Sequence, residues 1–134
     1  MLIFPLFSSG CEGGFNVEVK VFEQVNPPTS ANSTLYVQKE IPKDISAIPT
    51  QLAIVKMWRK AENPSEQGSI EKNFTDEKGK CSFGFMNAPL GTYVIEVEKE
   101  HYQTVQDEFE ITEKNDNPRY NHFINVLLIK ELTP

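Results

Sequence analysis

Apolar and polar residues alternate in several short stretches of this chain. The clearest is residues 15–22, where Phe15, Val17, Val19 and Val21 share one face. A period of two is typical of a β-strand with one buried face. Similar patterns cover residues 34–37, 69–75, 81–85, 93–98, 105–111 and 122–132. With residues 51–60, they predict about seven or eight strands and no long helix.

Residues 75–102 read as turn, strand, turn, strand, and we expect the sandwich to be built around them as a hairpin. Asp and Gly suit the first and last positions of the turn 76–79. Phe83 and Phe85 are expected in the core, and Pro89 and Gly91 favour a second turn. Tyr93, Ile95 and Val97 then mark the next half-buried strand.

Other segments have different patterns. Residues 51–60 are apolar at both alternating sets of positions, which predicts a strand covered on both faces. Residues 26–33 and 62–68 are rich in Pro, Asn and Ser and are expected to be loops. Residues 43–48, bracketed by two prolines, fit either a turn of helix or an irregular connection.

The chain has 134 residues, nine of them Phe, enough for one domain with a real core. Nine prolines and seven glycines between short apolar runs suit turns that join strands. We therefore expect an all-β, Greek-key β-sandwich, transthyretin-like or immunoglobulin-like, formed by residues 11–134.

The amino terminus reads MLIFPLFSSGCEGG. Residues 8–11 resemble a bacterial lipoprotein cleavage box, in which small residues precede a cysteine that becomes lipidated. Residues 1–10 are then the end of a truncated signal, Cys11 carries the lipid, and the protein is a cell-envelope lipoprotein or a periplasmic or extracellular one. The alternative is that residues 2–7 form a first strand and Cys11 is an ordinary thiol.

Cys11 and Cys81 are the two cysteines of the chain. A disulfide between them is one reading, and the spacing does not decide it. Cys81 is in phase with Phe83 and Phe85, which favours a buried free thiol.

A recognisable series of residues runs through 75–102. It consists of Thr75-Asp76, Gly79, Cys81, Phe83, Phe85, Pro89-Leu90-Gly91, Tyr93, Val97 and His101-Tyr102. The series resembles the carboxypeptidase regulatory-like domain. That resemblance implies a β-sandwich without chemistry of its own, a stabilising or recognition module found beside peptidases, in transporters and in surface lipoproteins.

The formal net charge of −6 argues against a nucleic-acid partner, because phosphate binding needs clustered cations. The densest basic group, Lys56, Arg59 and Lys60, is expected to be a solvated strand end. Neither His101 nor His122 has the spacing of a metal-ligand pair. The acidic residues 107–110 are read as a solvated strand face rather than a calcium site.

These patterns favour a protein that is not an enzyme and has no cofactor. We expect a non-catalytic binding or assembly module whose partner is a protein or carbohydrate at the cell surface, contacted through loops 26–49 and 62–68. It touches the membrane only through a lipid on Cys11. Trp58, Tyr36 and Tyr102 are read as core residues, or as a sugar platform if exposed. The alternative function is a small hydrolase or metal-dependent enzyme in which His101 and His122 converge.

Overall fold

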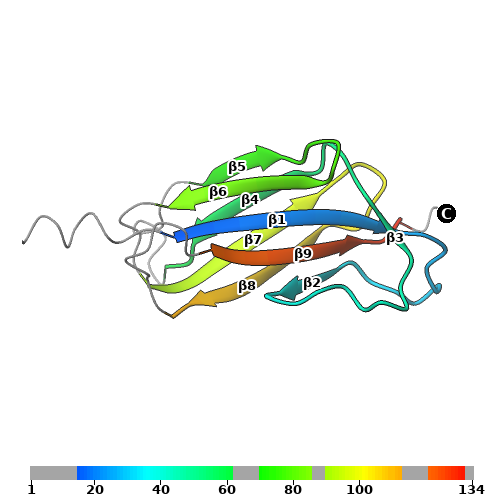
Figure 1. Ribbon diagram of the computed structural model, residues 1–134, viewed down its shortest axis with the longest axis horizontal. Coiled ribbons are helices and arrows are strands. Elements are labelled where there is room, and N and C mark those ends of the chain that lie inside the picture. The colour runs from blue at the N-terminus through cyan, green and yellow to red at the C-terminus, as the bar shows by residue number, and fades with distance from the viewer. Residues whose placement is uncertain (1–14, 62–69, 86–89, 113–120, 132–134) are drawn as a thin grey trace, which may run out of the picture.

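The computed structural model describes residues 15–61, 70–85, 90–112 and 121–131. Over these residues the chain forms nine strands in two packed sheets (Figure 1). The strands are β1 (Phe15–Gln24), β2 (Thr34–Val37), β3 (Ala47–Pro49), β4 (Ile54–Arg59), β5 (Glu71–Phe74), β6 (Lys80–Phe85), β7 (Gly91–Glu98), β8 (Val105–Ile111) and β9 (Asn121–Leu128). The expected all-β sandwich is confirmed. No helix in these ranges is long and apolar enough to cross a bilayer.

The first sheet has the order β2-β9-β1-β3, and β6 also pairs with β1. Strand β1 lies parallel to β9 over eight residue pairs, from Asn16 with Asn121 to Glu23 with Leu128. On its other side, β1 pairs first with β6 and then with β3. Both β1 and β9 are therefore interior strands of this sheet.

The second sheet has the order β5-β4-β7-β8 and is antiparallel throughout. The hairpin expected over residues 75–102 is wrong, because β6 pairs with β1 in the first sheet and β7 pairs with β4 and β8 in the second. Both strands bury their alternating apolar faces, but they do so from opposite sides of the core. The second expected turn spans residues 88–91; its first two residues lie outside the described residues, and its last, Gly91, begins β7.

The turn at 76–79 has the predicted chemistry. The Gly79 amide donates to the carbonyl of Asp76 at 2.9 Å, and Gly79 has a φ of +77°. One carboxylate oxygen of Asp76 accepts hydrogen bonds from the amides of Lys80 and Lys78, which lowers the pKa of that carboxyl. The turn links β5 to β6 and so carries the chain from one sheet to the other.

Gly79 also lies where β1 exchanges one partner strand for the next. The Val21 amide donates to the Gly79 carbonyl at 2.7 Å, and the Val21 carbonyl accepts from the Thr50 amide at 3.0 Å. A Cβ on Gly79 would lie 2.6 Å from the Val21 oxygen and 3.1 Å from Cβ of Pro49. Glycine is required here by conformation and by space.

A buried threonine closes the neighbouring corner. The Thr75 hydroxyl donates to the carbonyl of Thr50 at 2.8 Å and accepts from the amide of Ala53 at 2.9 Å. Because Thr75 is 2% exposed, this side chain satisfies two backbone groups that water does not reach.

The core lies between the two sheets. Its fully buried side chains include Val17, Val19, Val21, Val55, Met57, Tyr93, Ile95, Val97, Ile111, Ile124, Val126 and Leu128. At one end the ring of Phe15 stacks on Phe85 at 4.9 Å and meets Tyr93 edge to face at 5.3 Å. Phe83 is buried as predicted, and Phe85 is partly buried against the same cluster.

Two segments differ from the sequence prediction. Residues 51–60 are not covered on both faces: Val55 and Met57 are fully buried, whereas Leu52 is 63% exposed and Trp58 is half-buried. The outward face of β4 carries apolar side chains without a further layer of described chain above it. Residues 43–48, expected as a turn of helix or an irregular connection, are irregular up to Ser46 and then enter a short strand, β3, that was not predicted. Strand β3 pairs with the part of β1 that β6 does not reach.

Candidate functional site

The outer face of the first sheet carries polar side chains at its centre. Because Val17, Val19 and Val21 point into the core, Glu18 and Lys20 point outward from β1. The parallel register places Glu18 beside Phe123 and Lys20 beside Asn125 on β9. In each of these two pairs, residues about a hundred positions apart in the chain become direct neighbours on one surface.

The segment between β2 and β3, residues 38–46, crosses this face and is held to β9. Gln38 donates its amide to the carbonyl of Phe123 at 2.8 Å, and its side-chain oxygen accepts from the Phe123 amide at 2.6 Å. Asn125 donates its side-chain amide to the carbonyl of Lys39 at 2.7 Å. At the other end, the Ser46 carbonyl accepts from the Val25 amide at 2.9 Å, which returns the segment to the sheet.

Two adjoining cavities lie between this crossing segment and the sheet, and we call them together the groove. One is about 210 Å³ and is lined by Lys20, Phe22, Glu40, Ile41, Pro42, Lys43, Ile45, Ala47 and Asn125. The other is about 220 Å³ and is lined by Glu18, Lys20, Glu40, Phe123, Ile124 and Asn125. They share Lys20, Glu40 and Asn125, so an amine, a carboxylate and an amide stand at the centre.

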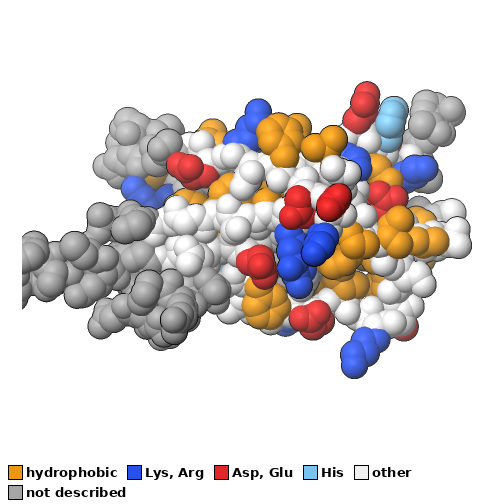
Figure 2. Space-filling model, turned by 45° about the horizontal axis from the view of Figure 1, so that its top comes forward, with side chains coloured by type: hydrophobic (Ala, Val, Ile, Leu, Met, Phe, Trp, Pro, Cys, Tyr) orange, Lys and Arg blue, Asp and Glu red, His pale blue; other side chains and the backbone are white. Residues whose placement is uncertain are grey.

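The groove suits a small polar group with an apolar side. Each cavity is smaller than the roughly 300–1,000 Å³ of a pocket for a drug-sized ligand, so it fits one side chain or one sugar ring. Phe123, at 36% exposure, offers an apolar surface next to the charged groups. Figure 2 shows acidic and basic side chains lying next to one another near the middle of the visible face, with hydrophobic side chains beside them.

The structure tests the prediction for Cys81 but not the one for Cys11. Cys81 is a buried free thiol, as predicted, and burial raises its pKa to about 12. A thiol with that pKa is neutral at physiological pH and so is a poor nucleophile. Cys11, the predicted lipidation site, lies outside the described residues, as do residues 1–10.

The two histidines do not share a site. His122 is buried at the start of β9, where its ring meets Phe15 edge to face at 6.1 Å. His101 is exposed, has a φ of +75°, and accepts the Glu131 amide on its carbonyl at 2.9 Å beyond the other end of β9. At the rise of an extended strand the two residues are roughly 30 Å apart. The arrangement required by the enzyme alternative is therefore not formed by these two imidazoles.

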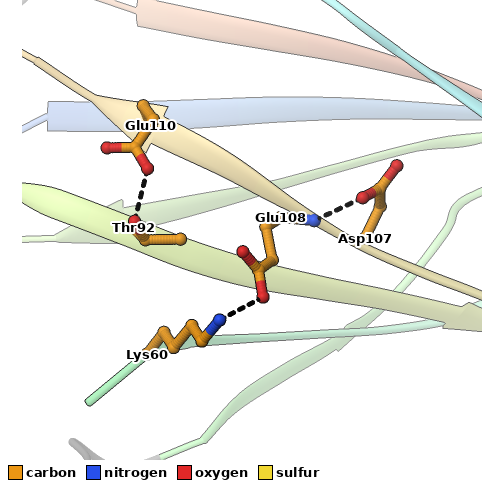
Figure 3. Close-up of polar contacts among 5 residues, drawn as sticks. All are labelled: Lys60, Thr92, Asp107, Glu108 and Glu110. Atoms are coloured by element: carbon orange, nitrogen blue, oxygen red, sulfur yellow. Dashed lines mark hydrogen bonds and ion pairs between the residues drawn. The ribbon is translucent and has the colours of Figure 1, made fainter. Parts of the chain in front are cut away.

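The acidic residues of β8 lie on its exposed part (Figure 3). Glu108 accepts from Nζ of Lys60 at 2.6 Å, Glu110 accepts from the Thr92 hydroxyl, and Asp107 accepts the Glu108 amide at 2.8 Å. Each carboxylate has a separate partner, and no group of three metal-binding side chains occurs among the described residues. This is the solvated strand face that the sequence predicted.

The basic group on β4 also lies against carboxylates. Nζ of Lys56 is 3.8 Å from Glu96 and 3.7 Å from Glu98 on β7, and all three side chains are partly exposed. Surface pairs of this kind contribute about 0–1 kcal/mol each. The group neutralises neighbouring charge on the sheet, in agreement with the prediction of a solvated strand end.

The three aromatic candidates do not form a platform. Trp58 lies on the second sheet, whereas Tyr36 pairs with Asn125 in the first. Tyr102 packs against the core, with Nζ of Lys99 5.9 Å from its ring centre. All three are half-buried; Tyr102 packs against the core as expected, and the three side chains do not form a shared sugar surface.

The two expected contact loops have different positions. Residues 26–33 are a loop, as predicted, and Ser33 ties it to the opposite sheet by donating its hydroxyl to the carbonyl of Gln103 at 2.9 Å. The crossing segment 38–46 belongs to the same predicted region and forms the groove. Residues 62–68 lie outside the part of the chain that the structure covers.

Sequence reasoning did not single out Lys20, Glu40 or Asn125 as site residues. The available signal was the polar half of the alternation in residues 15–22 and the lone Asn within the apolar run 123–129. A polar residue inside an otherwise apolar strand is a reason to look for a surface function.

The fold is an all-β, two-sheet sandwich that resembles transthyretin-like domains and immunoglobulin-like pilin domains. No family model matches the sequence, and no curated protein matches it. The β-sandwich implied by the resemblance to the carboxypeptidase regulatory-like domain is observed, but membership of that family is not shown.

Several solved structures superpose on the fold of this chain. The shaft pilin SpaA from Lactobacillus rhamnosus GG superposes with a TM-score of 0.59 at 12% identity, over 88% of this chain and 52% of the pilin. The 3-chlorocatechol 1,2-dioxygenase from Rhodococcus opacus 1CP gives 0.54 at 11% identity, over 88% and 60%. An (S)-allantoin synthase gives 0.53 at 13% identity, over 90% and 42%. The chain thus spans about half the length of these proteins, and the likeness is one of fold.

Proposed function

We propose that this domain is a non-catalytic binding or assembly module of a cell-surface or secreted protein, and that the groove is its contact surface. The observation that carries the proposal is the crossing segment 38–46, which is held by hydrogen bonds to β9 and leaves two cavities beneath it. A loop held in place over a sheet presents a preformed surface, and preformed surfaces lose little conformational entropy on binding.

The cell-surface location is supported by two independent features. The fold resembles that of a shaft pilin, and residues 8–11 resemble a lipoprotein cleavage box. The resemblance of residues 75–102 to the carboxypeptidase regulatory-like domain supports a recognition module without chemistry of its own. In this proposal Cys11 carries the lipid anchor and the groove faces a protein or carbohydrate at the surface.

The location is tested on the native organism. A membrane-impermeant amine reagent should label the protein on intact cells, and intact-mass analysis should show a chain that begins at Cys11 with acyl mass attached. Labelling only after lysis would exclude the surface location, and an unmodified start at Met1 would exclude the lipid anchor.

The groove is tested with two matched double variants. Lys20→Ala with Phe123→Ala removes an amine and a ring from the groove, whereas Lys72→Ala with Phe74→Ala removes the same two groups from β5 on the other sheet. Phe123 is 36% exposed and Phe74 is 48% exposed, so both changes are on the surface. Binding of the fluorescently labelled full chain to intact cells should fall about ten-fold or more in the groove variant. This is the loss expected when a side chain that the bound partner would bury is removed.

The control variant should bind like the unmodified chain. Protease treatment of the cells should abolish binding if the partner is a protein, and periodate oxidation should abolish it if the partner is a carbohydrate. Equal binding by both double variants, or no binding by the unmodified chain, would contradict the proposed contact surface.

A further inference from the structure

Strands β1 and β9 lie side by side and run in the same direction along the long axis of the molecule (Figure 1). The described chain enters β1 at Phe15 near one end of the sandwich and leaves β9 at Leu128 near the other. Tension applied to the chain before β1 and after β9 therefore pulls these two strands in opposite directions along their shared ladder.

This direction of pull decides how the ladder breaks. When two paired strands slide along each other, all the hydrogen bonds between them are strained together, and many must break in one step. When a hairpin is opened from its free end, the hydrogen bonds break one after another and each step needs less force. We propose that the β1–β9 pair acts as a mechanical clamp that lets this domain resist tension along its long axis.

Both clamp strands are also held on their outer sides. Strand β1 pairs with β6 over six residue pairs and with β3 over three, and β9 pairs with β2 over four. Neither strand is at an edge from which it can be peeled. A sliding movement must break the ladders on both sides of each clamp strand.

The core adds resistance to the same movement. The inward side chains of the two strands are Val17, Val19 and Val21 on β1 and Ile124, Val126 and Leu128 on β9, each 0–1% exposed. Protein interiors are close-packed, so a shift along the strand axis moves these side chains out of the spaces they fill. The ladder and the core therefore give way together.

The chain that follows β9 is tied to the residue before β2 and to the connection between β7 and β8. The Ile129 amide donates to the Ser33 hydroxyl at 2.9 Å, and the Ile129 carbonyl accepts from the Gln103 amide at 2.8 Å. The Glu131 amide donates to the carbonyl of His101 at 2.9 Å. These bonds keep the end of β9 from fraying, so the pull is transmitted to the full length of the clamp.

The proposal is tested by single-molecule force spectroscopy on the full chain with Cys11→Ser, held between two handle domains. The comparison is a second direction of pull in the same protein, through thiols introduced by Thr92→Cys and Glu110→Cys. These cross-strand partners lie at the open end of the β7–β8 hairpin, so this pull opens that hairpin. Cys81 does not compete for the handles, because it is buried.

At the same loading rate, unfolding by the terminal pull should need at least about twice the force of unfolding by the hairpin pull. The reason is that the unfolding force depends on the energy barrier met along the direction of pulling. Complete unfolding should release about 400 Å of chain at roughly 3.5 Å per residue. Equal forces in the two directions, or a lower force for the terminal pull, would overturn the clamp.

A matched pair of core variants gives a second readout. Val19→Ala shortens a fully buried side chain on β1, and Val97→Ala makes the same change on β7 of the other sheet. Both should lower the midpoint of chemical denaturation by similar amounts, but Val19→Ala should lower the terminal unfolding force more. Equal loss of force in the two variants, or unchanged force in Val19→Ala, would overturn the assignment to β1 and β9.

This inference does not depend on the proposed surface location or on the groove. It concerns an intrinsic property of the fold, measured on purified protein. Equal cell binding by the two double variants, together with a retained directional force difference, would contradict only the groove. Equal forces in the two directions, together with weaker binding by the groove variant alone, would contradict only the clamp.

Discussion

Replacement of Gly79 by alanine is expected to destabilise the domain more than the same change at any other described glycine. Two requirements meet at this position. The φ of +77° lies in the left-handed region, and an added Cβ would lie 2.6 Å from the carbonyl oxygen of Val21. The contact is with backbone of an interior strand, so a side-chain rotation does not relieve it.

The magnitude follows from three contributions. A left-handed conformation costs about 1 kcal/mol for a residue with a Cβ. Displacing the turn weakens the 2.7 Å hydrogen bond from the Val21 amide to the Gly79 carbonyl, worth about 1 kcal/mol. Forcing an extra carbon into a packed site costs about 1–3 kcal/mol. The total is about 3–5 kcal/mol, a large share of the roughly 5–15 kcal/mol that stabilises a typical domain.

Two other glycines separate these contributions. Gly91 has a φ of +133°, which residues with a Cβ rarely adopt, but nothing lies within 4 Å of its added Cβ, so Gly91→Ala should cost about 1–3 kcal/mol. Gly84 lies within β6 at an ordinary φ, and its Cβ would meet only the side-chain oxygen of Asn16 at 3.4 Å. Gly84→Ala should be neutral or stabilise the domain by up to about 1 kcal/mol, because glycine is unfavourable inside a strand.

Urea denaturation of the three variants, fitted with a common slope, gives the free energies of unfolding. Thermal unfolding should show the same order, with the midpoint of Gly79→Ala lower by about 10–20 °C for a domain of this size. If Gly79→Ala costs no more than Gly91→Ala, the close approach of the turn to β1 is refuted.

Three further predictions concern buried and titrating groups. Thr75→Val leaves two buried backbone groups without their partner and should cost about 2–3 kcal/mol in urea denaturation, whereas the control Thr92→Val should change stability by less than about 0.5 kcal/mol. Cys81 has a pKa raised from 9.0 to about 12, so above pH 9 the unfolded chain releases a proton that the folded chain retains. The free energy of unfolding should therefore fall by at most about 1.4 kcal/mol per pH unit between pH 9 and 12, and Cys81→Ala should remove that part of the slope. Asp76 should titrate below its ordinary 3.8 in a carboxyl NMR titration, and its contribution to stability should be lost as the pH falls through that lowered pKa. An ordinary value would contradict the two amide hydrogen bonds.

The parts of the fold that the sequence predicts are those set by local chemistry. Alternation placed Val17, Val19 and Val21 in the core because the side chains of a strand alternate between its two faces. The turn at 76–79 was predictable because its residues suit the required backbone angles. The burial of Cys81 followed from its phase with Phe83.

Strand partners are not encoded in the same way. The alternation of β6 and β7 shows that each has a buried face, but not that the two faces meet the core from opposite sheets. The sandwich could be predicted because many arrangements of such strands give two layers, whereas the hairpin required one particular pairing. That pairing depends on contacts between distant segments, which a local pattern does not contain.

The groove was predictable only as a region. Residues 26–49 were expected to contain the contact surface, and the segment 38–46 lies within them. The residues of the sheet beneath it were not found, because Lys20 and Asn125 become neighbours only through the parallel register of β1 and β9. A site assembled by long-range pairing needs the topology before its residues can be named.

The same parallel pairing imposes an order on synthesis. The strands of the second sheet all lie between Ile54 and Ile111, with β6 of the first sheet among them, and β9 is translated after all of them. A ribosome-bound chain can form the second sheet while β1 still lacks the neighbour that covers one of its edges. The inward valines of β1 and its unpaired edge are then exposed to other nascent chains, and pairing across so long a separation is slow. The pairing that we propose resists tension in the finished domain therefore leaves the first sheet incomplete until the last strand has been synthesised.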